Sequence, residues 1–285
     1  MNVSDYTLRA LHIGASVAHL VQFGYGEALV NSIYKDRGFF TLANPVATPP
    51  GSATSVETNP IATYQLTQLV PIFSLLSTMN HAWSAIDFKN YLSFVDRGYN
   101  PVRWSEYAIS AGLMNWVVAQ LSGVNDIKTL LFLVSANAAL QFTGYSIEKD
   151  TGRSLQSRNK FEAQNLFQAA GRQQVIGFAV FLSELIPIWI AFFTSLLQTR
   201  QDSDDSEIPA FVWAVIFVIT ALYLVFGIVS LYYFRGADRR ETKQGFLAFR
   251  ERNFRLIEVG YLILSLVAKT FLMNITLFGS TQSRT

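Results

Sequence analysis

The sequence contains no cysteine, and this absence excludes several kinds of chemistry at once. Disulfides, thiolate catalysis, cysteine-based zinc sites and iron–sulfur clusters all need thiol groups. Histidine is scarce too: the chain has three histidines, and none shows the His-x-x-x-His spacing of a metal-binding helix. The sequence therefore predicts no metal site.

Charged residues are also few, at 15% of 285 residues, compared with about 25% in a typical soluble domain. Three long stretches, 130–141, 175–197 and 209–234, contain a single charged residue, Glu184. Such runs are typical of membrane spans. The small net charge of +2 comes without a basic, aromatic-rich face, so we expect no nucleic-acid partner. The first 25 residues lack the basic start of a cleaved signal peptide.

Seven apolar runs are long enough to cross the ~30 Å hydrocarbon layer of a bilayer. We expect an all-α fold in which residues 1–285 form one domain, a bundle of seven transmembrane helices. The third and fourth helices should be antiparallel neighbours, because only residues 123–126 separate them. The seven predicted spans are 8–34, 61–87, 102–122, 127–146, 175–197, 208–234 and 258–278.

The distribution of lysine and arginine predicts the orientation of these spans. Sixteen basic residues fall on the side of the N-terminus, and five fall on the opposite side, which also carries the acidic segment 202–207. Cytoplasmic loops are the basic ones, so we expect a cytoplasmic N-terminus and an extracellular C-terminus. On this orientation 149–174 and 235–253 are cytoplasmic loops, and 35–60 is a long extracellular loop that could form a hairpin.

The remaining basic residue is Lys269, which lies in the middle of the last span. A lysine at the bilayer centre costs at least ~2.5–3.5 kcal/mol on insertion scales, so it needs a partner, a cavity or a covalent ligand. The alternative is a lysine whose side chain extends to the interface, but Lys269 lies about nine residues past Gly260 and nine before Phe278. Ser265 lies one helical turn before it, in the direction in which the side chain leans.

Glu106 is the best candidate for the partner of Lys269. It follows Arg103 by three residues in the third span, which runs in the same direction as the last. The helical rise places the two charged groups at similar depth. The alternative is a solvated carboxylate close to the start of a helix.

Polar residues on the first, second and fourth spans also fall on helical stripes. A histidine in a span can be a packing residue, but histidines on adjacent spans favour a shared internal cavity. Glu184, near the middle of the fifth span, is either a proton relay or a protonated, hydrogen-bonded carboxyl group. The members of these stripes include His12, His19, Gln22, His81, Asn137, Gln141, Tyr145 and Glu148.

Aromatic residues of the fifth and sixth spans could form the wall of an apolar ligand slot, or they could be ordinary packing and lipid-facing residues. They include Phe178, Phe181, Trp189, Phe217, Tyr223 and Phe226. No G-x-S-x-G, H-E-x-x-H or glycine-rich phosphate loop occurs, so we do not expect an enzyme.

With seven spans and one deep lysine in the last, the sequence resembles those of the retinal-binding rhodopsins. The predicted cytoplasmic N-terminus makes it similar to the heliorhodopsins within that group. Five short segments carry the resemblance, and His81 adds a further match on the second span. The segments are Ser-Leu-Val-Ala-Lys at 265–269, Arg-Trp-Ser-Glu-Tyr at 103–107, His-Leu-Val-Gln at 19–22, Ser-Ala-Asn-Ala at 135–138 and Ile-Pro-Ala-Phe-Val at 208–212.

The resemblance implies all-trans retinal bound covalently to Lys269 as a protonated Schiff base, with Glu106 as counterion and Ser265 beside the imine. Asn137 and Tyr223 would contact the chromophore. It also implies a homodimer in the lipid bilayer of the plasma membrane and a cytoplasmic signalling partner. A polar cavity or proton network would include His19, Gln22, His81, Glu148, Glu184 and Arg103.

The resemblance implies a light sensor whose output is a conformational change. Two other functions stay open. One is light-driven or light-gated proton transport through Glu106 and Glu184, because the resemblance implies a small residue where this chain has Glu184. The other is a retinal-free transporter or membrane enzyme that uses Lys269 as a charge.

Overall fold

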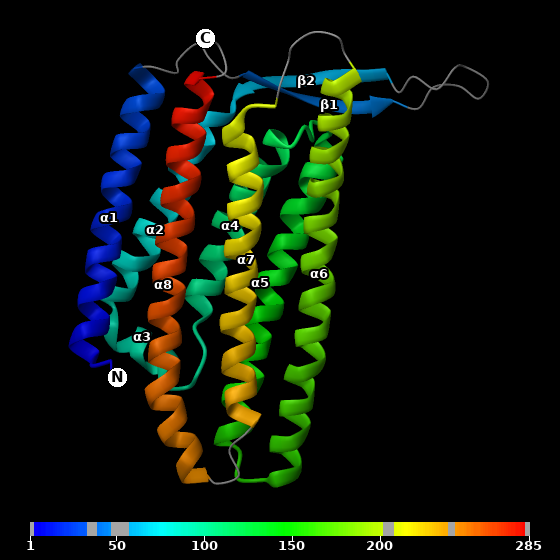
Figure 1. Ribbon diagram of the computed structural model, residues 1–285. Coiled ribbons are helices and arrows are strands. Elements are labelled where there is room, and N and C mark those ends of the chain that lie inside the picture. The colour runs from blue at the N-terminus through cyan, green and yellow to red at the C-terminus, as the bar shows by residue number, and fades with distance from the viewer. Residues whose placement is uncertain (1–2, 33–38, 47–56, 202–207, 239–242, 283–285) are drawn as a thin grey trace.

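The computed structural model describes residues 3–32, 39–46, 57–201, 208–238 and 243–282, in which seven long helices form a bundle (Figure 1). A two-stranded hairpin lies across the end of the bundle opposite the start of the first helix. The elements in chain order are α1 (Asp5–Ser32), β1 (Phe39–Val46), β2 (Glu57–Gln65), a 3-10 turn (Leu66–Gln68), α2 (Leu69–Ile86), α3 (Phe88–Val95), α4 (Pro101–Leu121), α5 (Ile127–Gln156), α6 (Lys160–Gln201), α7 (Ala210–Asp238) and α8 (Lys243–Gln282).

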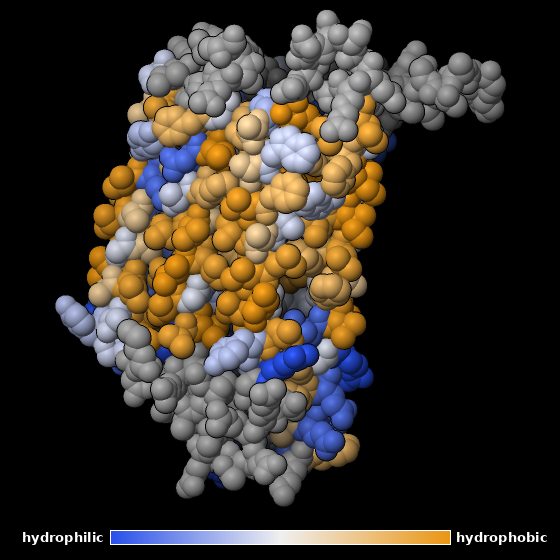
Figure 2. Space-filling view, viewed as in Figure 1, coloured by the Kyte–Doolittle hydropathy of each residue, from blue (hydrophilic) through white to orange (hydrophobic). Residues whose placement is uncertain are grey.

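The fold class predicted from the sequence is confirmed: the long helices make an all-α bundle of seven. Neighbouring helices pack in the ring order α8, α1, α2, α4, α5, α6 and α7. Among the described residues, four of these helices, α5 to α8, are long enough and apolar enough to cross a membrane. Figure 2 shows apolar side chains covering the middle of the visible face.

Several predicted boundaries differ from the structure because helices continue past their apolar runs. Residues 149–174, expected to be a loop, are mostly helical, since α5 extends to Gln156 and α6 begins at Lys160. With 42 residues, α6 is about 63 Å long at 1.5 Å per residue. Helix also covers most of 235–253, because α7 ends at Asp238 and α8 begins at Lys243.

The segment 35–60 contributes β1 and the first part of β2, and the two strands pair antiparallel with an irregular register between Leu42 and Ala43. The second helix is shorter than predicted, because residues 61–65 belong to β2 and α2 starts at Leu69. The short helix α3 was not expected. Residues 35–38, 47–56 and 202–207, which carry the rest of the predicted outer loops, lie outside the described residues.

Capping residues define where two of the central helices begin. Asn100 precedes α4 and its side chain accepts a hydrogen bond from the backbone N–H of Arg103, with Pro101 at the first helical position. Asp126 precedes α5 and accepts from the backbone N–H groups of Lys128 and Thr129. These caps define the residues at which α4 and α5 begin. Glu106 lies on α4 and Asn137 lies on α5.

The bundle has two apolar cores with polar residues between them. On α8, Phe254, Ile257 and Tyr261 belong to one core, and Leu272 and Leu277 belong to the other, nearer the hairpin. Lys269 lies between these two groups in the chain. The fold therefore places a charged group inside the bundle, where it needs a partner.

Candidate functional site

Lys269 is buried inside the bundle, with 2% of its surface exposed. Its Nζ atom donates a hydrogen bond to Oε1 of Glu106 at 2.7 Å and another to Oγ of Ser77 at 2.5 Å. The Ser77 hydroxyl group lies 2.8 Å from the same Glu106 oxygen and donates to it. Residues of α2, α4 and α8 therefore meet at one point.

The burial of this ion pair excludes the alternatives that the sequence left open for Lys269 and Glu106. Lys269 does not extend to an interface, because its amine is enclosed and paired with a carboxylate. Glu106 is not a solvated residue at a helix start, since only 9% of it is exposed. Breaking a buried pair leaves an uncompensated charge, so each partner stabilises the other in place.

A cavity of about 300 Å³ extends from Lys269 towards α6 and α7. This volume lies at the lower end of the range for small-molecule sites, and the lining is mostly apolar. Ser265, Ala268 and Lys269 line it from α8, and Asn137 and Tyr223 line it from α5 and α7. The expected chromophore contacts Ser265, Asn137 and Tyr223 thus face one cavity, although the amine of Lys269 hydrogen-bonds to Ser77 and Glu106.

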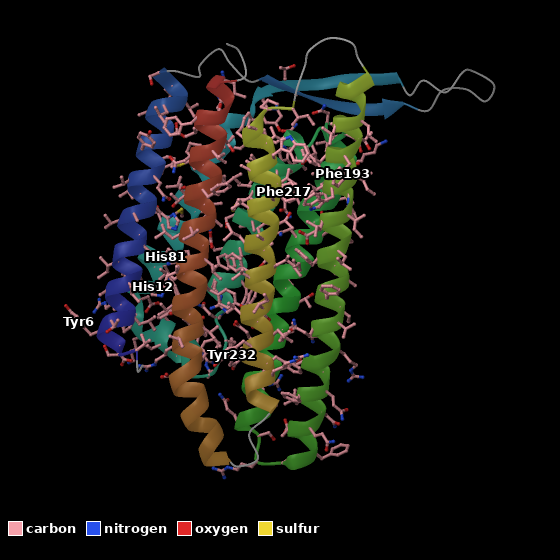
Figure 3. All side chains as sticks on the ribbon, in the orientation of Figure 1. Tyr6, His12, His81, Phe193, Phe217 and Tyr232 are labelled. Atoms are coloured by element: carbon pink, nitrogen blue, oxygen red, sulfur yellow. The ribbon has the colours of Figure 1, made fainter. Side chains whose placement is uncertain are left out.

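The aromatic residues of α6 and α7 divide into two groups. Phe178, Phe181, Tyr223 and Phe226 line the cavity. Trp189 instead packs against Phe217 and Phe193, with ring centroids 5.0 and 5.5 Å apart, towards the hairpin end of the bundle (Figure 3). The first group therefore forms part of a cavity wall, and the second group consists of ordinary packing residues.

Glu184 is 2% exposed and lies beside the cavity wall. Its Oε2 atom accepts hydrogen bonds from the side-chain amides of Asn115 at 2.7 Å and Asn137 at 3.2 Å. The described part of the chain contains no ion pair to Glu184. Asn137 connects this carboxyl group to the cavity that begins at Lys269.

The three histidines lie close together between α1 and α2. His12 and His81 are joined by a hydrogen bond, and the rings of His19 and His81 are stacked with centroids 5.7 Å apart. Nδ1 of His19 lies 2.9 Å from Oε1 of Gln22, and the Gln22 amide donates to Thr270, next to Lys269. Three of the expected cavity residues, His19, Gln22 and His81, are thus brought together.

Arg103 lies in a different cluster from Lys269. Its guanidinium group forms ion pairs with Glu148 and Glu258, and all three residues are buried. Trp104 Nε1 donates to Glu148 at 2.8 Å, and the Asn100 amide donates to Glu258 at 2.8 Å. Arg103 and Glu148 therefore tie α4 to α5 and α8 instead of lining the cavity.

Sequence reasoning did not assign site roles to three residues that the structure places in these clusters: Ser77, Asn115 and Glu258. Ser77 lies four residues before His81, so helical spacing already put it on the same face as a predicted cavity residue. Glu258 shares a helical stripe with Lys269, at a spacing of eleven residues. Asn115 carried no such signal. Among the described residues no group of three or more His, Asp or Glu could hold a metal ion.

Comparisons with known proteins show the family to which the chain belongs. The family model "Heliorhodopsin" matches residues 8–281, so the chain belongs to the heliorhodopsin family. No curated protein matches the sequence. Together with the family, the apolar helices and the buried lysine define an integral membrane protein of the retinal photoreceptor kind.

Solved structures share the fold at low sequence identity. A light-driven proton pump from Leptosphaeria maculans has a TM-score of 0.54 at 10% identity, covering 96% of each chain. The transmembrane domain and linker region of a rhodopsin phosphodiesterase from Salpingoeca rosetta has a TM-score of 0.52 at 12% identity. That match covers 95% of this chain and 71% of the other. At these identities the likeness shows the fold alone.

Proposed function

We propose that the protein is a non-enzymatic light sensor in which all-trans retinal is attached to Lys269 and Glu106 is the counterion. The observation that carries the proposal is the contact of 2.7 Å between Lys269 Nζ and Glu106 Oε1, because Lys269 also lines an apolar cavity. A primary amine on a side chain that lines a cavity is a chemical attachment point for an aldehyde. The adjacent carboxylate neutralises a cation at the same nitrogen.

The cavity residues fit retinal, which is an apolar, elongated molecule. Lys269 would attach it, and the other lining residues would contact it. These residues include Trp104, Tyr107, Phe181, Tyr223 and Asn137. When bound, retinal supplies absorption of visible light and a change of shape on isomerisation. The residues of the chain supply attachment, a mostly apolar lining and a fixed negative charge.

Glu106 and Ser77 hold the positive charge of the Lys269 nitrogen in one position. Coulombic attraction is stronger inside a protein than in water, so a displacement of this nitrogen from Glu106 raises the energy of the site. The hydrogen bonds among Lys269, Ser77 and Glu106 connect α8, α2 and α4. Their rearrangement would move these helices relative to one another and produce the conformational output.

The test is a visible absorption spectrum of the protein expressed in membranes with all-trans retinal. We expect a visible band in the wild type and in Lys128→Ala, a control that removes an exposed lysine. Lys269→Ala should remain colourless. A band retained in Lys269→Ala would contradict the proposal, and no band in folded wild type would favour a retinal-free role for Lys269.

The second candidate function is light-driven or light-gated proton transport through Glu106 and Glu184. The observation in its favour is the burial of Glu184 beside the cavity, with amide partners but no cation partner among the described residues. Light-induced currents in voltage-clamped cells test it. A proton current in the wild type that is lost in Glu184→Gln would support transport, and a coloured protein without current would support the sensor alone.

We further propose that the protein is a plasma-membrane homodimer with a cytoplasmic N-terminus and an extracellular C-terminus. The excess of lysine and arginine on the N-terminal side supports this orientation. A cytoplasmic signalling partner would then contact the basic side. The family resemblance supports the dimer, and chemical crosslinking in native membranes tests it.

A further inference from the structure

Two polar groups in the cavity lining lack hydrogen-bond partners. Oδ1 of Asn137 and the hydroxyl oxygen of Tyr223 are buried, and neither has a partner among the described residues. Both residues line the same cavity as Lys269, Asn137 from α5 and Tyr223 from α7. Buried polar atoms without partners are rare in proteins and call for an explanation such as a bound water or ligand.

The side chain of Asn137 is held in an orientation that leaves its oxygen atom without a donor. The Nδ2 atom donates to Oε2 of Glu184 at 3.2 Å, and only 1% of Asn137 is exposed. The same Glu184 oxygen accepts from Asn115 at 2.7 Å. Turning the Asn137 amide over would place its oxygen against this acceptor and lose a hydrogen bond. Oδ1 of Asn137 is therefore a fixed acceptor.

The electrostatic surroundings of Tyr223 differ from those of Tyr107, a second tyrosine of the cavity lining. Nζ of Lys269 lies 5.4 Å from the centre of the Tyr107 ring, and Glu106 acts electrostatically on the Tyr107 hydroxyl group. The charged group that acts on the Tyr223 hydroxyl group is Glu184. Tyr107 thus belongs to the attachment region of the cavity, and Tyr223 belongs to the region of Glu184.

Unsubstituted retinal offers no hydrogen-bond partner to either of the two groups. Its single oxygen atom is the aldehyde oxygen, which leaves as water when the aldehyde condenses with the Lys269 amine. The remaining polyene and ring consist of carbon and hydrogen. Oδ1 of Asn137 and the Tyr223 hydroxyl group would stay buried and unpaired beside such a ligand, at a cost in binding free energy.

We propose that the cavity is selective for a retinal that carries a hydroxyl group on its ring, bound between Asn137 and Tyr223. The ligand hydroxyl donates to Oδ1 of Asn137 and accepts from the Tyr223 hydroxyl group. A hydroxyl is a small neutral group that both donates and accepts, whereas a carboxylate would lie near Glu184 and offer no donor to Asn137. This selectivity rests on the proposed function, because Lys269 holds the aldehyde end and leaves the ring for the further contacts.

Competition between two aldehydes tests the selectivity. Retinal-free protein in lipid bilayers is incubated with equal amounts of all-trans retinal and all-trans 3-hydroxyretinal. Hydroxylamine then releases the bound aldehydes, and chromatography measures their ratio, corrected for their ratio in the lipid. We expect bound 3-hydroxyretinal to exceed bound retinal about fivefold, because it satisfies two buried polar groups. Equal amounts would overturn the proposal and favour water at Asn137 and Tyr223.

Two variants and a matched control locate the groups that bind the ligand hydroxyl. Tyr223→Phe removes one hydroxyl group and keeps the ring, so the preference should fall to about twofold or less. Asn137→Leu should lower it similarly, and Tyr223→Phe keeps the test decisive if Asn137→Leu fails to fold. Tyr232→Phe is the control and should keep the full preference, because Tyr232 lies on the same helix, is 55% exposed and is not among the described residues that line the cavity (Figure 3). An undiminished preference in Tyr223→Phe would overturn the proposal.

The same samples distinguish failure of the selectivity from failure of the proposed function. Equal binding of both aldehydes to a coloured protein would remove the selectivity and leave the light sensor intact. Binding of neither aldehyde to folded protein would contradict the proposed function, and the selectivity would fall with it. No aldehyde should be released from Lys269→Ala. A preference measured in Lys269→Ala would overturn the proposal, because the bilayer and not the cavity would then be selective.

Discussion

The hydroxyl oxygen of Ser77 lies 2.5 Å from Nζ of Lys269, closer than the carboxylate oxygen of Glu106 at 2.7 Å. Because Ser77 also donates to Glu106, the serine bridges the two charges. Lys269, Glu106 and Ser77 therefore form one hydrogen-bonded unit, and we expect Ser77 to help hold the Lys269 amine in place.

Replacement of Ser77 by alanine removes a buried hydroxyl group that hydrogen-bonds to charged partners. We expect the free energy of unfolding of the retinal-free protein to fall by about 1.5–3 kcal/mol. Reversible unfolding in mixed detergent micelles measures it. Ser74→Ala is the matched control, because the Ser74 hydroxyl group is buried without a hydrogen bond in the described residues. Equal losses in the two variants would refute the bridging role.

Glu106→Gln removes the negative charge beside Lys269 but keeps the size of the side chain. A counterion localises the positive charge on the nitrogen, so its loss should move the visible absorption maximum to longer wavelength. Glu184→Gln is the control, because Glu184 hydrogen-bonds to Asn115 and Asn137 and not to Lys269. An absorption maximum that moves more in Glu184→Gln than in Glu106→Gln would assign the counterion to Glu184.

Arg103→Gln leaves Glu148 and Glu258 buried without their shared cation. We expect a loss of about 3–5 kcal/mol in the free energy of unfolding, because the remaining charges are uncompensated. Addition of Glu258→Gln should recover part of this loss. Arg97→Gln, at an exposed arginine nearby, should change stability little. If the losses in the free energy of unfolding from Arg103→Gln and Glu258→Gln simply added in the double variant, the two residues would not be energetically coupled.

Gly144→Ala tests the close approach of α5 to Trp104 in the cavity wall. A Cβ atom at this position would lie 2.4 Å from the Trp104 ring, whose indole N–H is held by Glu148. The ring cannot move without weakening that bond, so we expect a loss of about 1–3 kcal/mol. Gly260→Ala is the control, since a Cβ there meets nothing within 4 Å. Thermal unfolding of the two variants should separate them clearly.

Hydropathy and charge were sufficient to predict the bundle, because apolar runs of membrane length have few alternative structures. The pairing of Lys269 with Glu106 could also be predicted, since parallel helices place residues at comparable depth. The sequence did not indicate that helices continue beyond their apolar runs, as α6 does, because polar residues can be helical in water. The short helix α3 was missed for a different reason, because its eight residues are too few to form an apolar run of membrane length.

The partners of Arg103 and Glu184 depend on the rotation of each helix about its axis, which hydropathy does not determine. Arg103 lies three residues before Glu106 and was expected to belong to a polar cavity or proton network. In the structure it pairs instead with Glu148 and Glu258. Asn115 is likewise an ordinary polar residue in the sequence and becomes a partner of Glu184 only through packing.

The measurement that tests the central claim most directly is the location of bound retinal on the chain. Borohydride reduction of the coloured membranes, followed by proteolysis and mass spectrometry, identifies the modified lysine. We predict that the added retinyl mass lies on the peptide that contains Lys269 and on none that contains Lys128 or Lys149. Retinyl on another lysine, or on no peptide of a coloured sample, would contradict the assignment of Lys269 as the attachment site.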